Sequence, residues 1–115
     1  MKTAFIFPGQ ASQKVGMGED LYLSNSNVRK SFEVANDIMG FDFKKIIFNG
    51  PAEVLKKTIY TQPAIYLISV TIAKILIKKG IKPQCTAGHS LGEYSALTIA
   101  NAFDFESGFE LVKLR

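Results

Sequence analysis

The segment from Gln62 to Lys79 constrains the fold of this chain more than any other part of the sequence. The pattern predicts one helix here, capped by Thr61 and closed by Gly80. Apolar side chains go nearly all the way round it, which is typical of a helix in the middle of a fold. These side chains are Ala64, Ile65, Leu67, Ile68, Val70, Ile72, Ala73, Ile75, Leu76 and Ile77.

The apolar stretch inside this helix, residues 63–77, falls short of the roughly 18 to 20 residues that a membrane span requires. Ser69, Thr71 and Lys74 also interrupt it. The apolar run at residues 4–7 is too short for the core of a signal peptide. Together with the single cysteine, these features predict a cytoplasmic protein with no membrane partner.

The rest of the composition narrows the function classes. With 115 residues, 47% of them hydrophobic and 21% charged, the chain has room for one domain. Cys85 and His89 are its only cysteine and histidine, which excludes an internal disulfide and leaves too few ligands for a structural zinc site. The basic residues behind the net charge of +4 are spread along the chain, so no nucleic acid partner is expected. The lysine pairs are interpreted as solvated helix faces, with attraction to an acidic partner or a phosphorylated ligand as the alternative.

Short strands and capped helices alternate along the chain. Two apolar strands are predicted, at residues 3–7 and 85–87, each followed by a glycine-containing loop. Five other helices are predicted. Before the second strand, one follows an Asn27 cap and ends at Met39, a short turn of helix follows Asp42, and a third begins at Pro51 and ends near Lys57. After the second strand, one helix ends at Ala100 and another begins at Phe105 with Asp104 as its cap. No stop signal closes the last helix, so we expect the chain to be part of something longer.

A Gly-x-Ser-x-Gly motif, at Gly88, Ser90 and Gly92, lies between the second strand and the next helix. A serine on such a sharp turn is held in a strained backbone with its hydroxyl exposed, and the glycines let neighbouring chain approach. The Leu91 amide, and a second amide such as that of Gln10 in the other loop, could stabilise a developing oxyanion. The motif indicates a nucleophilic serine, with a tight turn around a buried serine as the alternative.

Five segments resemble those of one family: FPGQASQ at residues 7–13, GMG at 16–18, GPAE at 50–53, TQPA at 61–64 and GHSLGEYSAL at 88–97. Together they resemble the malonyl-CoA:acyl carrier protein transacylases of type II fatty acid synthesis, whose fold also serves polyketide and type I fatty acid synthases. The resemblance covers all 115 residues in the family's order. It implies an α/β fold in which residues 1–115 form the N-terminal segment of the large subdomain of an α/β-hydrolase-like acyltransferase domain. That segment is helix-rich, with short parallel strands, and the family's ferredoxin-like subdomain lies outside it.

The resemblance also implies a ping-pong acyl transfer. Ser90 takes a malonyl group from coenzyme A as an ester and yields it to the phosphopantetheine thiol of acyl carrier protein. The oxyanion amides fall on Gln10 and Leu91. Arg115 would bind the free carboxylate of malonate, and Gln62 lies near the same pocket. The coenzyme A thioester is a substrate, and no cofactor is expected.

His89 is interpreted as a structural residue rather than the general base, because neighbours on such a turn point to different sides. The family's catalytic histidine falls beyond residue 115, so the chain alone is expected to be inactive or nearly so. Cys85 is interpreted as a small buried strand residue. Unpaired strand edges and apolar faces predict self-association. The preference between malonyl and branched malonyl groups stays open, although Leu91 favours malonyl by resemblance.

Two other functions stay open. The first is a serine esterase or thioesterase that uses the same turn and passes the acyl group to water. The second is a truncated copy that serves as a binding module without catalysis.

Overall fold

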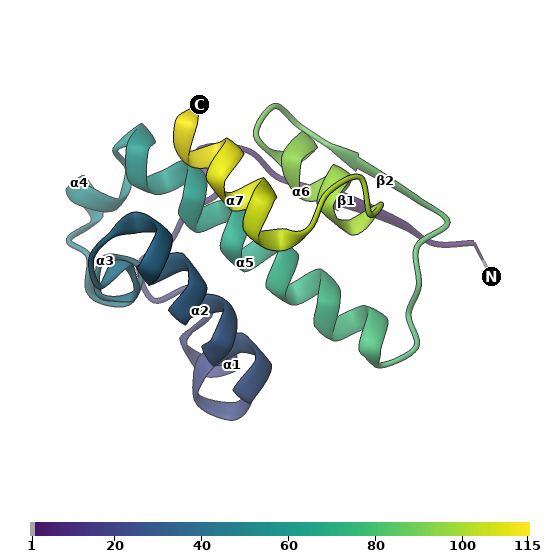
Figure 1. Ribbon diagram of the computed structural model, residues 1–115, viewed down its shortest axis with the longest axis horizontal. Coiled ribbons are helices and arrows are strands. Elements are labelled where there is room, and N and C mark those ends of the chain that lie inside the picture. Colours follow the sequence, from purple (N-terminus) through teal and green to yellow (C-terminus); the bar gives the residue numbers. More distant parts are fainter. Residues whose placement is uncertain (1) are drawn as a thin grey trace.

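Two short parallel strands form the sheet of this protein, whose computed structural model describes residues 2–115. Strand β1 (Ala4–Phe7) pairs with β2 (Cys85–Gly88), in a register that sets Phe7 opposite Gly88. The helix-rich α/β class predicted from the sequence is confirmed (Figure 1). The helices are α1 (Glu19–Ser24), α2 (Ser26–Met39), α3 (Phe43–Asn49), α4 (Ala52–Leu55), α5 (Thr58–Lys78), α6 (Gly92–Ile99) and α7 (Phe105–Leu114).

Helix α5 runs through the middle of the molecule, with α2 and α3 on one side and α6 and the strands on the other (Figure 1). Every side chain from Pro63 to Ile68 is buried, which confirms the prediction of a central helix. By length and composition α5 is also a candidate membrane span, but half of its 18-residue apolar window is buried inside the protein. Much of the apolar surface of α5 is therefore used by the core.

Tyr66 connects α5 to the last two helices. Its hydroxyl donates to the Phe105 carbonyl oxygen at 2.8 Å and lies 2.9 Å from Thr98 Oγ1. Its ring stacks on Phe105 with centroids 5.5 Å apart. Burial raises the pKa of Tyr66 to about 12, because an ionised phenol would lose its hydration there. These contacts fix α6 and α7 against α5, and both helices carry residues of the candidate site.

The start of α2 differs from the sequence prediction. Asn25, not Asn27, is the N-cap, and its Oδ1 accepts from the backbone N–H groups of Asn27 at 2.9 Å and Val28 at 3.3 Å. Asn25 has the extended backbone that an N-cap requires, whereas Asn27 is already helical. The short helix α1 just before it was not predicted.

Helix α5 begins four residues earlier than predicted, at Thr58. Thr61 is not its cap but a fully buried residue of its second turn, and Pro63 lies inside the helix. The prediction was wrong because proline usually marks the first turn of a helix. Here the buried packing of the segment outweighs the hydrogen bond that Pro63 cannot donate.

Two smaller expectations also need correction. Asp42 occupies the N-cap position of α3, but its side chain accepts from Asn36 Nδ2 at 3.1 Å and caps no backbone N–H. Cys85 is exposed and not buried, because residues of the short strand β2 that face away from α6 have no covering layer within residues 2–115.

Candidate active site

Ser90 lies on a sharp turn between the end of β2 and the start of α6. It is exposed and has a φ of 55°, a left-handed conformation that costs about 1 kcal/mol or more for a residue with a side chain. The expected strained turn is present, and the alternative of a buried serine is wrong. The hydroxyl of Ser90 is thereby accessible to a reactant.

The positions of Gly88 and Gly92, on either side of Ser90, leave no room for a side chain. A Cβ at Gly88 would overlap the backbone of Gly92, and a Cβ at Gly92 would overlap the carbonyl oxygen of Phe7. The first residue of α6 therefore rests directly on the end of β1. This contact brings the loops after β1 and β2 to the same edge of the sheet.

The two loops also touch each other. The His89 N–H donates to the Phe7 carbonyl oxygen at 3.1 Å, and a Cβ at Gly9 would meet the His89 carbonyl oxygen at 2.6 Å. Gln10 follows Gly9 in the first loop, and Leu91 follows Ser90 in the second. These are the two residues whose backbone N–H groups were predicted to bind the oxyanion. Within residues 2–115, neither of their backbone N–H groups donates a hydrogen bond, so both are free to serve a ligand.

Arg115 reaches Ser90 from the end of α7. Its Nη2 donates to Ser90 Oγ at 3.1 Å, and its Cζ lies 5.4 Å from the centroid of the Tyr94 ring. Tyr94 lies in the first turn of α6, so Arg115 contacts both the serine turn and the helix that follows it. The structure thus brings together the predicted nucleophile and the predicted carboxylate-binding residue, which are 25 positions apart in the sequence.

Helix α7, which carries Arg115 at its end, is held by contacts near both of its ends. As predicted, Asp104 caps it, with Oδ1 accepting from the Ser107 N–H at 2.7 Å. The hydrogen bond from this backbone N–H holds the pKa of the Asp104 carboxyl below its ordinary value. Near the other end, Lys113 Nζ donates to the Ile38 carbonyl oxygen of α2 at 2.8 Å.

Gln62 lies beside the Gln10 loop rather than beside Ser90. Its Nε2 donates to Gln10 Oε1 at 3.3 Å, and Gln10 Nε2 donates to Thr58 Oγ1 at 3.2 Å. Sequence reasoning missed Thr58 because the predicted helix began after it. It also missed Tyr94, although this residue lies in the segment at residues 88–97 that carries part of the resemblance.

His89 and Ser90 do not form a base and nucleophile pair. Both side chains are exposed, and within the described residues the His89 imidazole makes no hydrogen bond to the Ser90 hydroxyl. The Nδ1 atom of His89 instead lies next to Gly9, 3.4 Å from the place of a Cβ there. Residues 2–115 also hold no group of three or more His, Cys, Asp or Glu side chains arranged for a metal ion.

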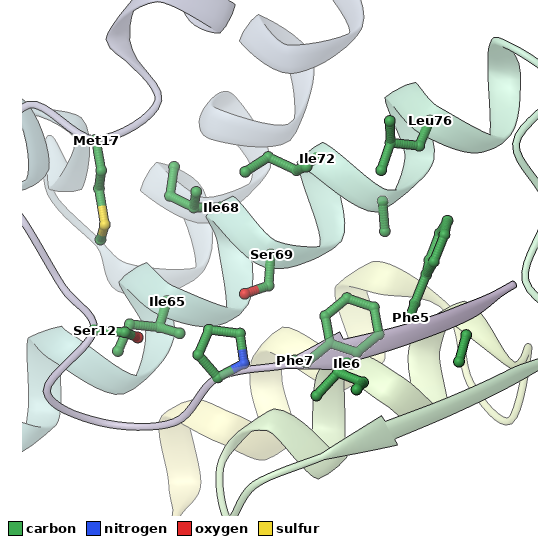
Figure 2. A pocket seen from close by; sticks show the side chains of 13 residues that line it. Phe5, Ile6, Phe7, Ser12, Met17, Ile65, Ile68, Ser69, Ile72 and Leu76 are labelled. Carbon is green, nitrogen blue, oxygen red and sulfur yellow. The ribbon is translucent and has the colours of Figure 1, made fainter.

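An apolar pocket of about 360 Å³ lies away from these residues, between β1 and α5. Figure 2 shows Phe5 and Phe7 of the strand facing Ser69, Ile72 and Leu76 of the helix. None of the site residues lines it. The chemistry expected of Ser90 therefore belongs to the edge where the two loops meet and not to this pocket.

Comparison with known proteins confirms the resemblance inferred from the motifs. The family model of the acyl transferase domain matches residues 4–115. The chain is 47% identical to a malonyl CoA-acyl carrier protein transacylase of Haemophilus influenzae, over 99% of this chain and 37% of that protein. A relative with the same description from Synechocystis sp. is also 47% identical, over 100% of this chain and 39% of the relative. The chain thus spans less than half the length of these curated relatives.

Solved structures agree with this result. The crystal structure of a Synechocystis sp. malonyl-CoA:ACP transacylase has a TM-score of 0.93 and 46% identity, over 98% of this chain and 38% of that one. A malonyl transacylase solved in complex with its type II polyketide acyl carrier protein has a TM-score of 0.92 and 43% identity. That match covers 99% of this chain and 37% of the transacylase.

Proposed function

This chain belongs to the acyl transferase domain family, and we propose that its Ser90 is the nucleophile of a malonyl-CoA:acyl carrier protein transacylase. The observation that carries the proposal is the exposed Ser90 hydroxyl on its strained turn, with the Arg115 guanidinium 3.1 Å away. A nucleophile beside a fixed cation suits an acyl group that carries its own carboxylate. The descriptions of two relatives that are each 47% identical to this chain support the same proposal.

The proposed reaction has two half-reactions. Ser90 Oγ attacks the thioester carbonyl carbon of malonyl-CoA and gives its proton to a base, while the carbonyl electron pair moves onto oxygen. The oxyanion accepts hydrogen bonds from the Gln10 and Leu91 N–H groups. When the carbonyl re-forms, the C–S bond breaks and coenzyme A leaves as the thiol, with a malonyl ester on Ser90. The phosphopantetheine thiol of acyl carrier protein then attacks this ester, and Ser90 recovers its proton.

Arg115 selects the acyl group in this proposal. A malonyl group carries a free carboxylate one carbon away from the reacting carbonyl, so a cation that touches Ser90 Oγ is within reach of it. A guanidinium offers paired donors to a carboxylate and stays charged at any working pH. In this proposal Gln62 adds a further polar side chain to the acyl pocket, next to Gln10, with which it forms a hydrogen bond. The thioester is already activated, and we propose that no cofactor takes part.

The general base is proposed to come from outside residues 2–115, since His89 does not contact the Ser90 hydroxyl within them. Nucleophile and base act as one unit in such sites, so the 115-residue chain alone should react several orders of magnitude more slowly than a whole domain. We further propose a cytoplasmic location, with malonyl-CoA and acyl carrier protein as partners and with neither nucleic acid nor membrane involved.

A chimaera tests the proposed specificity. In it, residues 1–115 replace the matching segment of the Haemophilus influenzae relative, so that the rest of a family domain is present. Malonyl-CoA should be preferred over acetyl-CoA, and Arg115→Ala should lower malonyl transfer by about a hundredfold, since a charge-assisted hydrogen bond is worth roughly 1.5–3 kcal/mol. Acetyl transfer should change little.

Lys113→Ala is the matched control, because it removes an exposed cation from the same helix without touching Ser90. It should leave the malonyl preference unchanged. If Arg115→Ala leaves the preference for malonyl-CoA intact and the acyl group passes to water, the protein is an esterase or thioesterase and the proposal is wrong. If coenzyme A thioesters do not label Ser90 even in the chimaera, the chain is a binding module.

A further inference from the structure

The side chain of Gln10 is hydrogen-bonded to the central helix at both of its polar atoms. Gln10 Nε2 donates to Thr58 Oγ1 at 3.2 Å, and Gln10 Oε1 accepts from Gln62 Nε2 at 3.3 Å. Thr58 and Gln62 are the first and fifth residues of α5, so they lie one above the other on one face of the helix. The Gln10 side chain, from the loop after β1, therefore bridges a full turn of α5.

The backbone of the same loop is held by local contacts that do not involve the Gln10 side chain. Ser12 Oγ donates to the Gly9 carbonyl oxygen at 2.7 Å, and the Ala11 N–H donates to Gln13 Oε1 at 2.9 Å. Ala11 has a φ of 85° and Gly9 is packed against His89. These contacts shape the turn, but within residues 2–115 the hydrogen bonds of Gln10 to other elements are the two made by its side chain.

We propose that Thr58 is a positioning residue for acyl transfer, which fixes the Gln10 side chain and through it the direction of the Gln10 backbone N–H. This inference rests on the proposed function, in which that N–H donates to the oxyanion. Oxyanion donors act by being set before the reaction, so that no reorganisation is needed when the charge develops. A small misplacement of such a donor lowers the reaction rate without changing how substrate is bound.

The position of Thr58 allows this role to be separated from a structural one. Thr58 is exposed, lies outside the core, and its side chain caps no backbone N–H of α5. Valine has the same shape as threonine but lacks the hydroxyl. Thr58→Val therefore removes the hydrogen bond from Gln10 and leaves the packing of α5 as it is, whereas Thr58→Ser keeps the hydroxyl.

The test measures single-turnover acylation of Ser90 by malonyl-CoA in the chimaera. Removal of a whole oxyanion donor costs roughly 10²–10³ in rate, so a donor left in place but loosened should cost less. We expect Thr58→Val to lower the maximal acylation rate by about tenfold, with the half-saturating concentration of malonyl-CoA changed by less than about twofold. Thr58→Ser should restore most of the rate, and both variants should unfold at the same urea concentration as the parent.

A double-mutant cycle shows whether the effect passes through Gln10. Gln10→Ala keeps the backbone N–H but loses both side-chain bonds, so it should lower the acylation rate at least as much as Thr58→Val. The two changes together should then cost no more than Gln10→Ala alone, because they break the same connection.

The outcomes separate this inference from the function it rests on. If the parent chimaera acylates Ser90 and Thr58→Val does so at the same rate, the inference is wrong and the proposed function stands. Losses that multiply in the double variant also overturn it, since Thr58 would then act without Gln10. If the parent forms no malonyl ester on Ser90, the proposed function fails and the inference fails with it.

Discussion

At the scale of single residues, the Ser90 turn depends on what its neighbours lack. Gly88 and Gly92 have no Cβ, so β2, α6 and the end of β1 can approach closely enough to hold Ser90 at a φ of 55°. The sequence predicts a sharp turn here because Gly-x-Ser-x-Gly between a strand and a helix is typical of a serine held in a strained backbone. It does not predict the contact of Tyr94 with Arg115 or that of Thr58 with Gln10, since each joins residues of elements that lie far apart in the sequence.

Tyr66 gives a prediction at the same scale. Its pKa is raised to about 12 from an ordinary value near 10, so the folded state holds the phenol proton more tightly than the unfolded chain. Its contribution to stability is therefore complete below pH 10 and is lost as pH rises from about 10 through 12. Urea unfolding of the 115-residue chain should show a free energy of unfolding that falls over this range, and falls less steeply in Tyr66→Phe.

Below pH 10, Tyr66→Phe should lower the free energy of unfolding by about 0.5–1.5 kcal/mol, since it removes the buried hydrogen bond from the Tyr66 hydroxyl to the Phe105 carbonyl oxygen. Tyr60→Phe is the control, because Tyr60 is half-buried and its hydroxyl makes no hydrogen bond within residues 2–115. Equal losses in the two variants, or parallel pH curves for the parent and Tyr66→Phe, would contradict this account of the Tyr66 hydroxyl.

At the scale of elements, some helix ends follow from the local sequence, whereas others depend on how the helix packs. Asp104 caps α7 as predicted, because an aspartate before an apolar helix has few competitors nearby. At α2, two asparagines lie two residues apart, and the sequence alone does not distinguish them. At α5, the burial of every side chain from Pro63 to Ile68 outweighs the missing hydrogen bond of the proline, and no local signal reports that packing.

The two asparagines therefore provide a matched test. Asn25→Ala should lower the free energy of unfolding by about 1 kcal/mol, because the N–H groups of Asn27 and Val28 lose their acceptor. Asn27→Ala, at the exposed position that the sequence favoured, should change it by less than about 0.5 kcal/mol. Chemical denaturation of the two variants checks this, and the reverse order would show that α2 is capped as the sequence first indicated.

At the scale of the whole molecule, the two-stranded sheet leaves strand edges and apolar side chains uncovered within residues 2–115. Ile6 of β1 is 79% exposed and borders the apolar pocket between β1 and α5. We expect the 115-residue chain to self-associate through this face, which sedimentation velocity would detect as species larger than a monomer.

Charged substitutions locate the associating face. Ile6→Lys should shift the chain towards monomer, because a lysine on an edge strand disfavours pairing with another copy. Ile59→Lys, at a 67% exposed position on α5, should have a smaller effect. A parent chain that sediments as a single monomer at every concentration would contradict the prediction.

The proposed function also depends on how the whole molecule brings its parts together. The proposed nucleophile Ser90, both proposed oxyanion amides and the proposed carboxylate-binding Arg115 lie within residues 2–115, while the base is proposed to lie outside them. The order of these parts follows the family, and their convergence at one edge of the sheet follows from the packing of α5, α6 and α7.

The most direct measurement is peptide mass mapping after the chimaera is mixed with malonyl-CoA in the absence of acyl carrier protein. We predict one malonyl ester, located on Ser90, absent in Ser90→Ala, and removed when acyl carrier protein with its phosphopantetheine thiol is added. The 115-residue chain alone should acquire this ester only very slowly. A malonyl group on another residue, or none on Ser90, would contradict the assignment of Ser90 as the nucleophile.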